Sequence, residues 1–473
     1  MNQKIQPQLN LVTLIIIVIT VLLVTKHNVN STSYPKDELL GLNLAHSMSL
    51  LSESTREKNN TVRILFYGQS ITRDYWWKGV NIALKHRFPH ANIISKNLAI
   101  GGFPAQRLVL NTARDIISFY PDLIIFHVYG SNQDYERIIQ KMRTLTTADI
   151  AIQTDHVAGK GNDWSTFMNE YFLPKIAAKY KCELIDVRSH WREYLQKHNY
   201  QPSQLLRDKI HLNSWGNLLM AQTVRSALVA NPKAVDWAQD RTKTYEIKES
   251  GTLNLEFVGN RVDAIATLLG NSKAEIFIDG KHPSDIPDLY VFSRANDTGT
   301  VDWPWDVSAP FVISWQTPPV AEDWLLTILE VKSSGDTLEF TFELTGSQTG
   351  FDGIGNNKEK FISNSGRVVI LPEHWWLKTD NGKPSPIKPG YKLHFYSELL
   401  GTDIYQKPPF RGFNREATVT LAQGLTNTKH TLTIVPLESK KVPIKSIRVY
   451  KPPLKESDLS LETITFEEWL KFR

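Results

Sequence analysis

Four polar segments of this chain hold the residue types needed for nucleophilic attack on an ester. Ser70 lies in "YGQSITRDYWW", directly after the apolar run "VRILF". "NLAIGG" contains Gly102, "YGSNQD" contains Asn132, and "DKIHLNSWG" contains both Asp208 and His211. A serine becomes a nucleophile when a histidine removes its proton, a carboxylate holds that histidine, and N–H donors bind the oxyanion. These five residues include every one of those parts.

Each of the five residues also has an ordinary structural explanation. Ser70, between a strand and a helix, can be a helix N-cap, and Asn132 can cap the helix that follows it. Gly102 can be a turn glycine, Asp208 a turn residue and His211 an exposed histidine. Their order and expected position favour catalysis, because they come at the carboxyl ends of strands or at the entry to the last helix. One crevice can therefore collect them all.

The elements that must position these residues alternate between strand and helix. From Thr61 to about Asn231, apolar runs such as "TVRILFY", "PDLIIFHVY" and "ADIAIQT" are each followed by a helical pattern. Strands that are apolar throughout are buried on both faces, as in a parallel sheet between two layers of helices. We therefore expect an α/β domain over residues 61–232.

Taken together, the four segments resemble the SGNH (GDSL-type) hydrolase superfamily, in which a serine, a glycine, an asparagine and a histidine come in this order. The resemblance covers roughly residues 61–231 and implies a flavodoxin-like three-layer parallel sheet. It implies that Ser70 is the nucleophile, His211 the general base and Asp208 the residue that orients the base. The oxyanion donors that it implies are the N–H groups of Ser70 and Gly102, with Gly101 as the competing glycine, and the side chain of Asn132.

One residue departs from the pattern of the family. The first block usually reads Gly-Asp-Ser, and here Gln69 replaces the acid. The nucleophile and the base are retained, and a neutral amide can still donate or accept a hydrogen bond in the same place. The weaker candidates for substrate contact are Gln69, Trp76, Trp77 and His156. The two tryptophans can equally be core residues.

After residue 244 the pattern changes to short runs of period two, separated by Gly, Asn, Asp and Pro. This pattern predicts an all-β region over residues 245–455, a jelly roll or related sandwich in one or two modules. The region contains two aromatic pairs, Trp303 with Trp305 and Trp375 with Trp376. Such side chains can stack on sugar faces or fill the core between sheets. Parts of the region look like the jelly-roll modules that accompany exported SGNH esterases. The final "LETITFEEWLKFR" predicts a short helix.

The N-terminal segment points outside the cytoplasm. Residues 11–24, "LVTLIIIVITVLLV", carry no charge, Gly or Pro, which is typical of a signal peptide or a membrane anchor over residues 1–27. A polar lead-in follows over residues 28–60. If the segment is uncleaved, residues 11–24 contact the membrane.

The overall composition excludes some classes of function. A net charge of +5 over 473 residues, with basic residues spread singly, does not indicate nucleic-acid binding. The single cysteine, Cys182, cannot form an intramolecular disulfide, and no Cys/His spacing resembles a zinc site. We expect neither a metal nor an organic cofactor.

These features predict a serine esterase, secreted, periplasmic or anchored facing outside the cytoplasm. It would remove acetyl or other short acyl groups from an acylated polysaccharide or oligosaccharide through an acyl-enzyme. Two alternatives stay open. A carbohydrate O-acyltransferase would use the same residues, and a non-catalytic glycan-binding protein on a degenerate hydrolase scaffold would explain Gln69 as a trace of decay.

Overall fold

The computed structural model describes residues 40–159, 161–238, 240–248, 251–296, 309–334, 337–377, 387–409, 412–439, 441–460 and 464–471. The chain divides into two compact units, Met1–Leu40 and Gly41–Arg473, and the fold below belongs to the second. The expected signal or anchor at residues 11–24 lies outside the described residues, as do Trp303 and Trp305. No helix within the described ranges is both long and apolar enough to cross a membrane.

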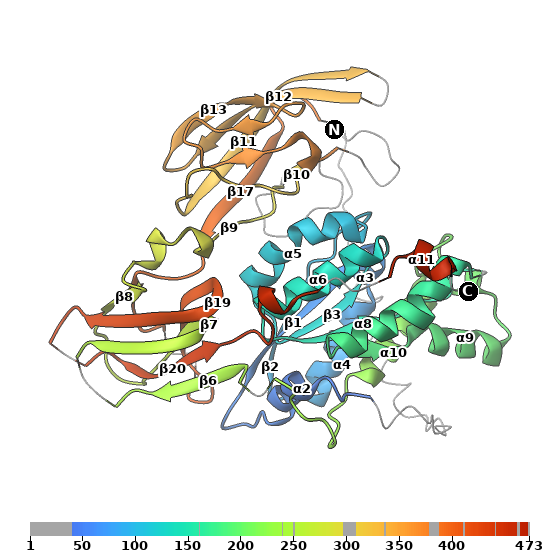
Figure 1. The fold of residues 1–473 in the computed structure, drawn as a ribbon, viewed down its shortest axis with the longest axis horizontal. Helices are drawn as coiled ribbons and strands as arrows, with labels where there is room; N and C mark the ends of the chain where they lie inside the picture. Colours follow the sequence, from blue (N-terminus) through green and yellow to red (C-terminus); the bar gives the residue numbers. More distant parts are fainter. Residues whose placement is uncertain are drawn as a thin grey trace, which may run out of the picture. The chain divides into compact units, whose positions relative to one another are not determined.

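A five-stranded parallel sheet forms the centre of the α/β domain (Figure 1). The strand order is β2 (Asn92–Asn97), β1 (Thr61–Gly68), β3 (Leu123–His127), β4 (Asp149–Gln153) and β5 (Glu183–Ile185). The chain moves from β1 to one neighbour, β2, and then to the other, β3. The order therefore reverses beside the carboxyl end of β1, and in sheets of this kind ligands bind in the crevice at that point.

Helices cover both faces of this sheet. Figure 1 shows α5 and α6 on one face and α2, α4 and α10 on the other. β3 and β4 are buried along their whole length, which explains why their sequences are uniformly apolar. The helices are α2 (Ala45–Ser52), α3 (Ser70–Arg73), α4 (Trp76–Arg87), α5 (Ala105–Phe119), α6 (Asn132–Leu145), α7 (Asp163–Thr166), the π-helix η2 (Phe167–Phe172), α8 (Leu173–Lys179), α9 (Val187–His198), the 3₁₀ turn η3 (Pro202–Leu205) and α10 (Ser214–Ala227).

Helix α2 lies within the segment that the sequence suggests is a lead-in. Its Ser47 donates from both the backbone N–H and the hydroxyl to the buried carboxylate of Asp149, at 2.8 and 2.9 Å. The backbone N–H of Gly41 donates to Glu183 at 2.7 Å. The residues from Gly41 onwards are thus part of the α/β domain. Local sequence patterns do not reveal these contacts with Asp149 and Glu183.

The all-β region contains two modules with separate hydrophobic cores. The first is a six-stranded sheet of order β18 (Ile404–Tyr405), β8 (Ala274–Ile278), β19 (Thr418–Pro436), β7 (Leu253–Ala266), β20 (Ile444–Tyr450) and β6 (Thr242–Glu246). The second is inserted between β8 and β18 and contains a five-stranded sheet of order β13 (Gly350–Asn356), β12 (Thr337–Gly346), β11 (Glu322–Ser334), β17 (Lys392–Leu399) and β9 (Tyr290–Phe292).

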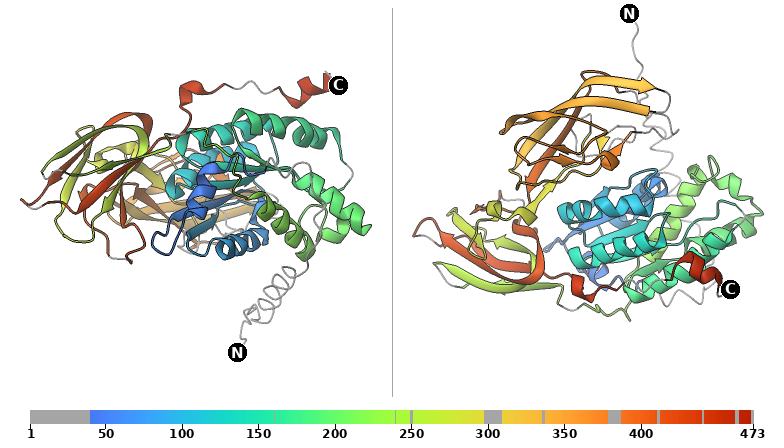
Figure 2. Two further views of the ribbon diagram at one scale, coloured as in Figure 1. Left: turned by 90° about the horizontal axis from the view of Figure 1, so that it is seen from below. Right: turned by 45° about the horizontal axis from the view of Figure 1, so that its top comes forward.

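The inserted module also carries two short strand pairs, β10 (Ala309–Pro310) with β16 (Trp375–Trp376) and β14 (Phe361–Ile362) with β15 (Val369–Ile370). Figure 2 shows it as a separate group of strands drawn in yellow and orange. The chain then returns to the six-stranded sheet, passes η7 (Glu456–Asp458) and reaches α11 (Phe466–Lys471). The remaining 3₁₀ turns are η4 (Pro283–Asp285), η5 (Pro287–Leu289) and η6 (Pro372–His374).

Buried polar contacts join the inserted module to the α/β domain. The Arg294 guanidinium lies 2.6 Å from the carboxylate of Asp115 on α5, and both side chains are almost completely buried. Arg294 also donates to the carbonyl oxygen of Leu98 at 2.8 Å. Burial acts to raise the pKa of Asp115, but the nearby Arg294 and Arg114 guanidiniums hold it below its usual value. This charged contact fixes the module on α5 and on the loop that follows β2.

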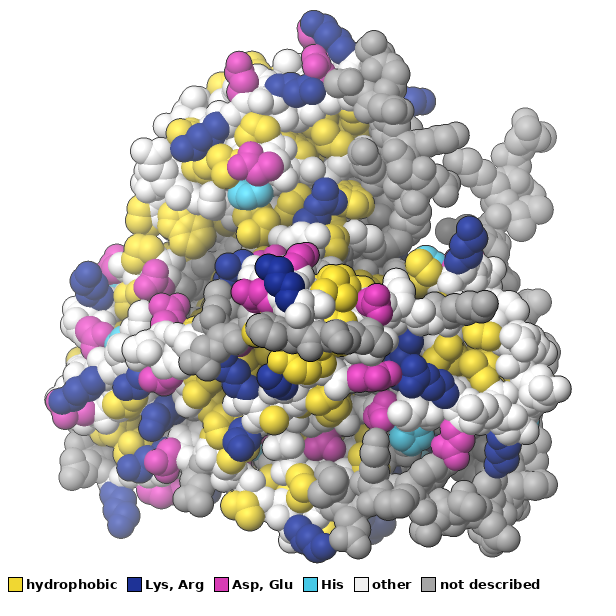
Figure 3. All heavy atoms as spheres, turned by 45° about the vertical axis from the view of Figure 1, so that its right-hand side comes forward, with side chains coloured by type: hydrophobic (Ala, Val, Ile, Leu, Met, Phe, Trp, Pro, Cys, Tyr) yellow, Lys and Arg dark blue, Asp and Glu magenta, His cyan; other side chains and the backbone are white. Residues whose placement is uncertain are grey.

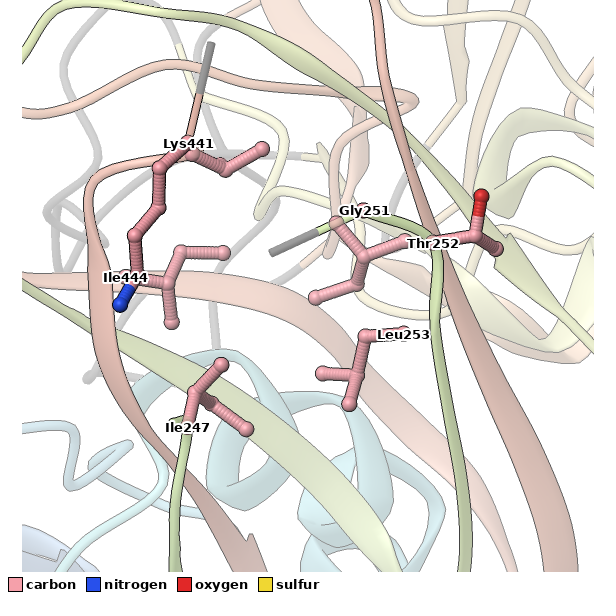
Figure 4. A pocket seen from close by; sticks show the side chains of 8 residues that line it. Ile247, Gly251, Thr252, Leu253, Lys441 and Ile444 are labelled. Carbon is pink, nitrogen blue, oxygen red and sulfur yellow. The ribbon is translucent and has the colours of Figure 1, made fainter. Parts of the chain in front are cut away.

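Two further features of the surface concern its charge and a small recess. On the face drawn in Figure 3, Lys and Arg side chains are interspersed with Asp and Glu and form no continuous basic area. A small recess in the six-stranded module is lined by Ile247, Leu253 and Ile444, with Lys441 at its edge (Figure 4). Its lining is mainly aliphatic, so we regard it as a gap in packing.

Candidate active site

Ser70 is the first residue of the short helix α3, directly beyond the end of β1. Gly68 has φ +147°, and a β-carbon there would lie 1.9 Å from the carbonyl oxygen of His127 at the end of β3. Only glycine allows the two strand ends to approach this closely. The approach places Ser70 at the carboxyl edge of the sheet, beside the point where the strand order reverses.

The loop between η3 and α10 brings Asp208 and His211 to Ser70. His211 Nδ1 lies 2.8 Å from Asp208 Oδ2, and His211 Nε2 lies 3.0 Å from Ser70 Oγ. Because the ionised carboxylate can only accept, Nδ1 carries the proton, and Nε2 is left to accept the proton of Ser70. The three side chains form one continuous chain of hydrogen bonds in the order that base catalysis requires.

The loop also holds the Asp208 carboxylate in its charged form. Desolvation acts to raise the pKa of Asp208, but the backbone N–H groups of His211 and Ile210 and the imidazole of His211 lower it to about 2. Asp208 and His211 are 50% and 31% exposed, so the pair opens to solvent. A permanently ionised, accessible carboxylate can stabilise an imidazolium if one forms at His211.

Three hydrogen bonds hold the loop of Asp208 and His211 in place. Arg207 donates its backbone N–H to the carbonyl of His211 at 2.9 Å and its guanidinium to Asp74 at 2.8 Å. From the interior, His156 Nε2 lies 2.8 Å from the carbonyl oxygen of Ile210 and therefore donates to it. Burial, followed by the neighbouring His127, lowers the pKa of His156 to about 4, so the ring is neutral near pH 7. His156 therefore supports the loop from below.

Gly102 lies in a tight turn after β2, closed by a hydrogen bond of 3.3 Å from Phe103 N–H to the carbonyl of Ile100. Its φ of +69° is in the left-handed region, which favours glycine. Gly102 is exposed and Gly101 is buried. Among the described residues, the backbone N–H groups of Ser70 and Gly102 meet no protein acceptor. Both N–H groups are therefore free to bind an oxyanion.

Asn132 begins α6, but the residue that caps this helix is Ser131, whose hydroxyl accepts from Asp134 N–H at 3.2 Å. The side chain of Asn132 is thus not used as a cap. It is buried, with 5% exposed, and its Nδ2 donates to the carbonyl oxygen of Ile464 at 3.2 Å. This contact brings Ile464, which lies just before the start of α11, to a proposed oxyanion donor and could not be read from local sequence.

The weaker candidates for substrate contact lie in different environments. Trp76 is 1% exposed, its ring N–H donates to the carbonyl of Ile71 at 2.6 Å, and it packs edge-on against Phe66, so the structure places it in the core. Trp77 is half-buried. His156, 2% exposed, offers no surface to a substrate. Gln69 is 7% exposed, and its Nε2 finds no hydrogen-bond partner among the described residues.

Three exposed residues flank Ser70 or His211 along the chain, and the sequence patterns did not single them out. Tyr75 is 69% exposed at the end of the α3 turn, and Trp215 is 62% exposed at the start of α10. Ile210, next to His211, is 47% exposed. The available signal was their spacing, because each lies within five residues of Ser70 or His211.

The inserted β module also reaches the loop that carries Gly102. Ring atoms of Trp376 on β16 lie 3.6 and 3.7 Å from the position that a β-carbon would take on Gly102. The same ring contacts Phe103, with centroids 5.0 Å apart, and lies 4.8 Å from the Arg107 guanidinium. Trp376, expected in the sandwich core or on a sugar, lies instead against the loop that carries Gly102.

Two other side chains that could do chemistry lie in the interior. His127, the last residue of β3, is 3% exposed and pairs with Asp155 at 2.9 Å. Cys182 is buried, and desolvation raises the pKa of its thiol. Within the described ranges, no group of three or more His, Cys, Asp or Glu side chains is arranged to hold a metal ion.

Among the comparisons with known proteins, only the comparison with solved structures finds proteins similar to this chain. No family model and no curated protein matches the chain. An alpha/beta hydrolase enzyme from the metagenome of Lake Arreo, Spain, is 20% identical over 36% of this chain and 97% of its own, with a TM-score of 0.32. An acetyl xylan esterase is 24% identical over 36% of this chain and 100% of its own, with a TM-score of 0.30. An acetylxylan esterase from Geobacillus stearothermophilus is 18% identical over 37% of this chain and 96% of its own, with a TM-score of 0.32. About a third of the chain is thus similar to solved esterases and hydrolases of this kind.

Proposed function

We propose that the protein is a serine esterase that removes acetyl or another short acyl group from a carbohydrate outside the cytoplasm. The observation that carries this proposal is the unbroken hydrogen-bond chain from Ser70 through His211 to Asp208. The intact contact between base and nucleophile, together with the N–H groups of Ser70 and Gly102 that meet no acceptor among the described residues, also argues against a degenerate hydrolase scaffold. The uncharged residues 11–24 support export.

The first half of the proposed reaction forms an acyl-enzyme. Ser70 Oγ attacks the acyl carbonyl carbon while its proton passes to His211 Nε2, and Asp208 stabilises the resulting imidazolium. The oxyanion accepts hydrogen bonds from the N–H groups of Ser70 and Gly102 and from the side chain of Asn132. The tetrahedral intermediate then collapses, the bond to the sugar oxygen breaks, and that oxygen takes the proton from His211.

The second half returns the enzyme to its starting state. His211 Nε2 removes a proton from water as the water oxygen attacks the acyl carbon. The same three donors hold the second oxyanion. Collapse then breaks the bond to Ser70 Oγ, which recovers its proton from His211, and the short carboxylic acid leaves.

Exposed aromatic rings that are close to the triad residues in sequence support a carbohydrate as the substrate. Tyr75 and Trp215 present rings that are more than half exposed, although burial is the usual fate of such side chains. The hydrogen bond from Arg207 to Asp74 ties the chain just before Tyr75 to the catalytic loop that leads into Trp215. Flat apolar rings with a polar edge suit the alternating CH and OH surfaces of a sugar.

The test is active-site labelling combined with hydrolysis. We expect the purified protein to react with a fluorophosphonate probe and to hydrolyse p-nitrophenyl acetate. Ser70→Ala and His211→Ala should each lose labelling and reduce kcat at least about 10³-fold. Ser214→Ala changes an exposed serine at the start of α10 that is outside the triad, and should leave both readouts unchanged.

A second arm tests the acceptor and the acyl group. Acetate release from acetylated xylooligosaccharides, measured against transfer to an added unacetylated glycan, separates hydrolysis from transfer. Faster transfer than hydrolysis would assign an O-acyltransferase. Failure of the wild-type protein to label or to hydrolyse any acyl ester would refute both enzymatic functions.

A further inference from the structure

Residues 464–471, here called the C-terminal segment, lie against the α/β domain beside a proposed catalytic group. Figures 1 and 2 show α11, drawn in red, next to the helices that follow β4. A capping box starts this helix: Thr465 N–H donates to the Glu468 carboxylate at 2.7 Å, and Glu468 N–H donates to the Thr465 hydroxyl at 3.1 Å. The segment thus has defined local structure immediately after Ile464.

Two aromatic side chains anchor the C-terminal segment. The Phe466 ring meets Trp164 edge-to-face with centroids 5.0 Å apart, and it lies 5.5 Å from Phe167. The Trp469 ring lies 5.5 Å from Phe167 and 6.5 Å from Tyr171. These partners belong to α7 and the π-helix η2, and π-helical turns occur frequently at functional sites. The anchors fix the position of the Ile464 carbonyl.

That carbonyl accepts from the side chain of Asn132 at 3.2 Å. The Nδ2 atom carries two N–H groups, so one is used by Ile464 and one remains. A carboxamide rotates easily between two orientations, and the opposite one would point its oxygen where Nδ2 now lies. A backbone carbonyl can bind only the nitrogen side. The contact with Ile464 therefore selects the orientation in which Asn132 can act as a donor.

The Ile464 carbonyl does not itself occupy the oxyanion hole. In the proposed oxyanion hole all three donors bind one oxygen, so an oxygen held there would also accept from the N–H groups of Ser70 and Gly102. Among the described residues neither N–H meets a protein acceptor. The geometry therefore favours support of Asn132 over blockage of the site.

We propose that the C-terminal segment is a positioning element of the oxyanion hole, in which Phe466 and Trp469 hold the Ile464 carbonyl that orients the Asn132 amide. This inference rests on the proposed esterase function and adds a role for residues outside the α/β sheet. Phe466 and Trp469 act through Asn132 and do not touch the reacting atoms. The catalytic rate consequently depends on anchors that lie more than 300 residues along the chain from that donor.

The experiment is a double-mutant cycle in the full-length chain. Phe466→Ala/Trp469→Ala should lower kcat for p-nitrophenyl acetate about 10-fold, with little change in KM, because the amide of Asn132 loses its preferred orientation. Asn132→Ala should lower kcat by about 10²–10³-fold, as expected when one oxyanion donor is lost. Combining all three substitutions should cause no loss beyond that of Asn132→Ala, since the anchors act only through that side chain.

Controls separate this role from general stability. Leu470→Ala, on the same helix and 43% exposed, should behave as wild type. Phe466→Leu/Trp469→Phe should restore most of the wild-type kcat. The midpoint of thermal unfolding of every variant should lie well above the assay temperature.

Three results would overturn the inference while leaving the esterase intact: an unchanged kcat in the anchor variant, an increased kcat, or the same 10-fold loss in the Asn132→Ala background. An increase would identify the segment as an inhibitory strap. A wild-type protein without esterase activity or labelling would instead refute the proposed function, and this inference with it.

Discussion

At the scale of single residues, the candidate site separates groups that must be charged from groups that must be neutral. Asp208 is ionised because the backbone of its own loop donates to it, which offsets partial desolvation and lowers its pKa to about 2. His156 is neutral because it is buried, with a pKa of about 4. Both groups act on the loop that carries His211, one through its carboxylate and one through its ring N–H.

The depressed pKa of His156 predicts a pH-dependent stability. An unfolded histidine titrates near 6.5, so between pH 6.5 and about 4 the unfolded chain binds a proton that the folded chain does not. The stabilisation is complete above pH 6.5 and is lost as the pH falls towards 4, by an amount on the order of 3 kcal/mol. We expect His156→Gln, which keeps a donor for the Ile210 carbonyl but cannot titrate, to flatten this part of the profile. Urea unfolding at pH 7.5, 6, 5 and 4 measures the free energy of unfolding of the wild-type protein and of the variant. If the two free energies changed in parallel with pH, the prediction would be wrong.

At the scale of elements, the candidate site depends on how closely strand ends can approach. The β1 and β3 ends meet at Gly68, where a side chain would collide with backbone. At Gly102, by contrast, a β-carbon would make only ordinary contacts with Trp376, so the requirement for glycine is conformational. The two glycines are thus needed for different reasons.

These two reasons predict different costs of substitution. Gly102→Ala places an alanine at φ +69° and should cost about 1 kcal/mol of stability. Gly68→Ala should cost considerably more, because the carbonyl of His127 cannot move away without separating β1 from β3. Urea midpoints of the two variants test the order, and equal midpoints would show that the β1–β3 junction is not rigid.

How much of this could be predicted from the sequence depends on how far apart the contacting elements are in the chain. The alternation of apolar runs and helices predicts a parallel sheet, and its strand ends bring Ser70 and the loop of Asp208 and His211 together. A short helix was also expected near the C-terminal end, where α11 lies. The contacts of Trp376 and Ile464 were not predictable, because local periodicity shows which face of an element is apolar but not what covers it.

At the scale of the whole described molecule, the inserted β module is bound to the α/β domain through a buried ion pair. Arg294 serves both Asp115 and the carbonyl of Leu98, the residue that opens the loop leading to Gly102. A buried pair contributes little compared with apolar packing, but removal of one partner leaves an uncompensated charge. The module and the loop that leads to Gly102 should therefore be energetically coupled.

Arg294→Met tests that coupling. We expect the free energy of unfolding to fall by about 3 kcal/mol. This is near the lower end of the range for breaking a buried ion pair, because Asp115 keeps its contact with Arg114 at 3.0 Å. The matched control, Lys429→Met, breaks an exposed pair with Glu256 whose side chains are 65% and 67% exposed, and should change stability by less than about 1 kcal/mol. Thermal and urea unfolding of the two variants give the comparison. Equal effects would mean that the Arg294 contact is as solvent-screened as a surface pair.

The hydrogen bond between Asn132 and Ile464 has a consequence for the time at which the candidate site is completed. The two residues are 332 positions apart, so at ordinary rates of synthesis Ile464 leaves the ribosome roughly half a minute after Asn132. By then the α/β sheet and both β modules have been made and can fold. The contact between Ser70, His211 and Asp208 can therefore form early, whereas the orientation of the Asn132 side chain waits for a distant segment. Under the proposed function, a nascent chain would hold Ser70 and His211 together long before Asn132 is oriented as a donor.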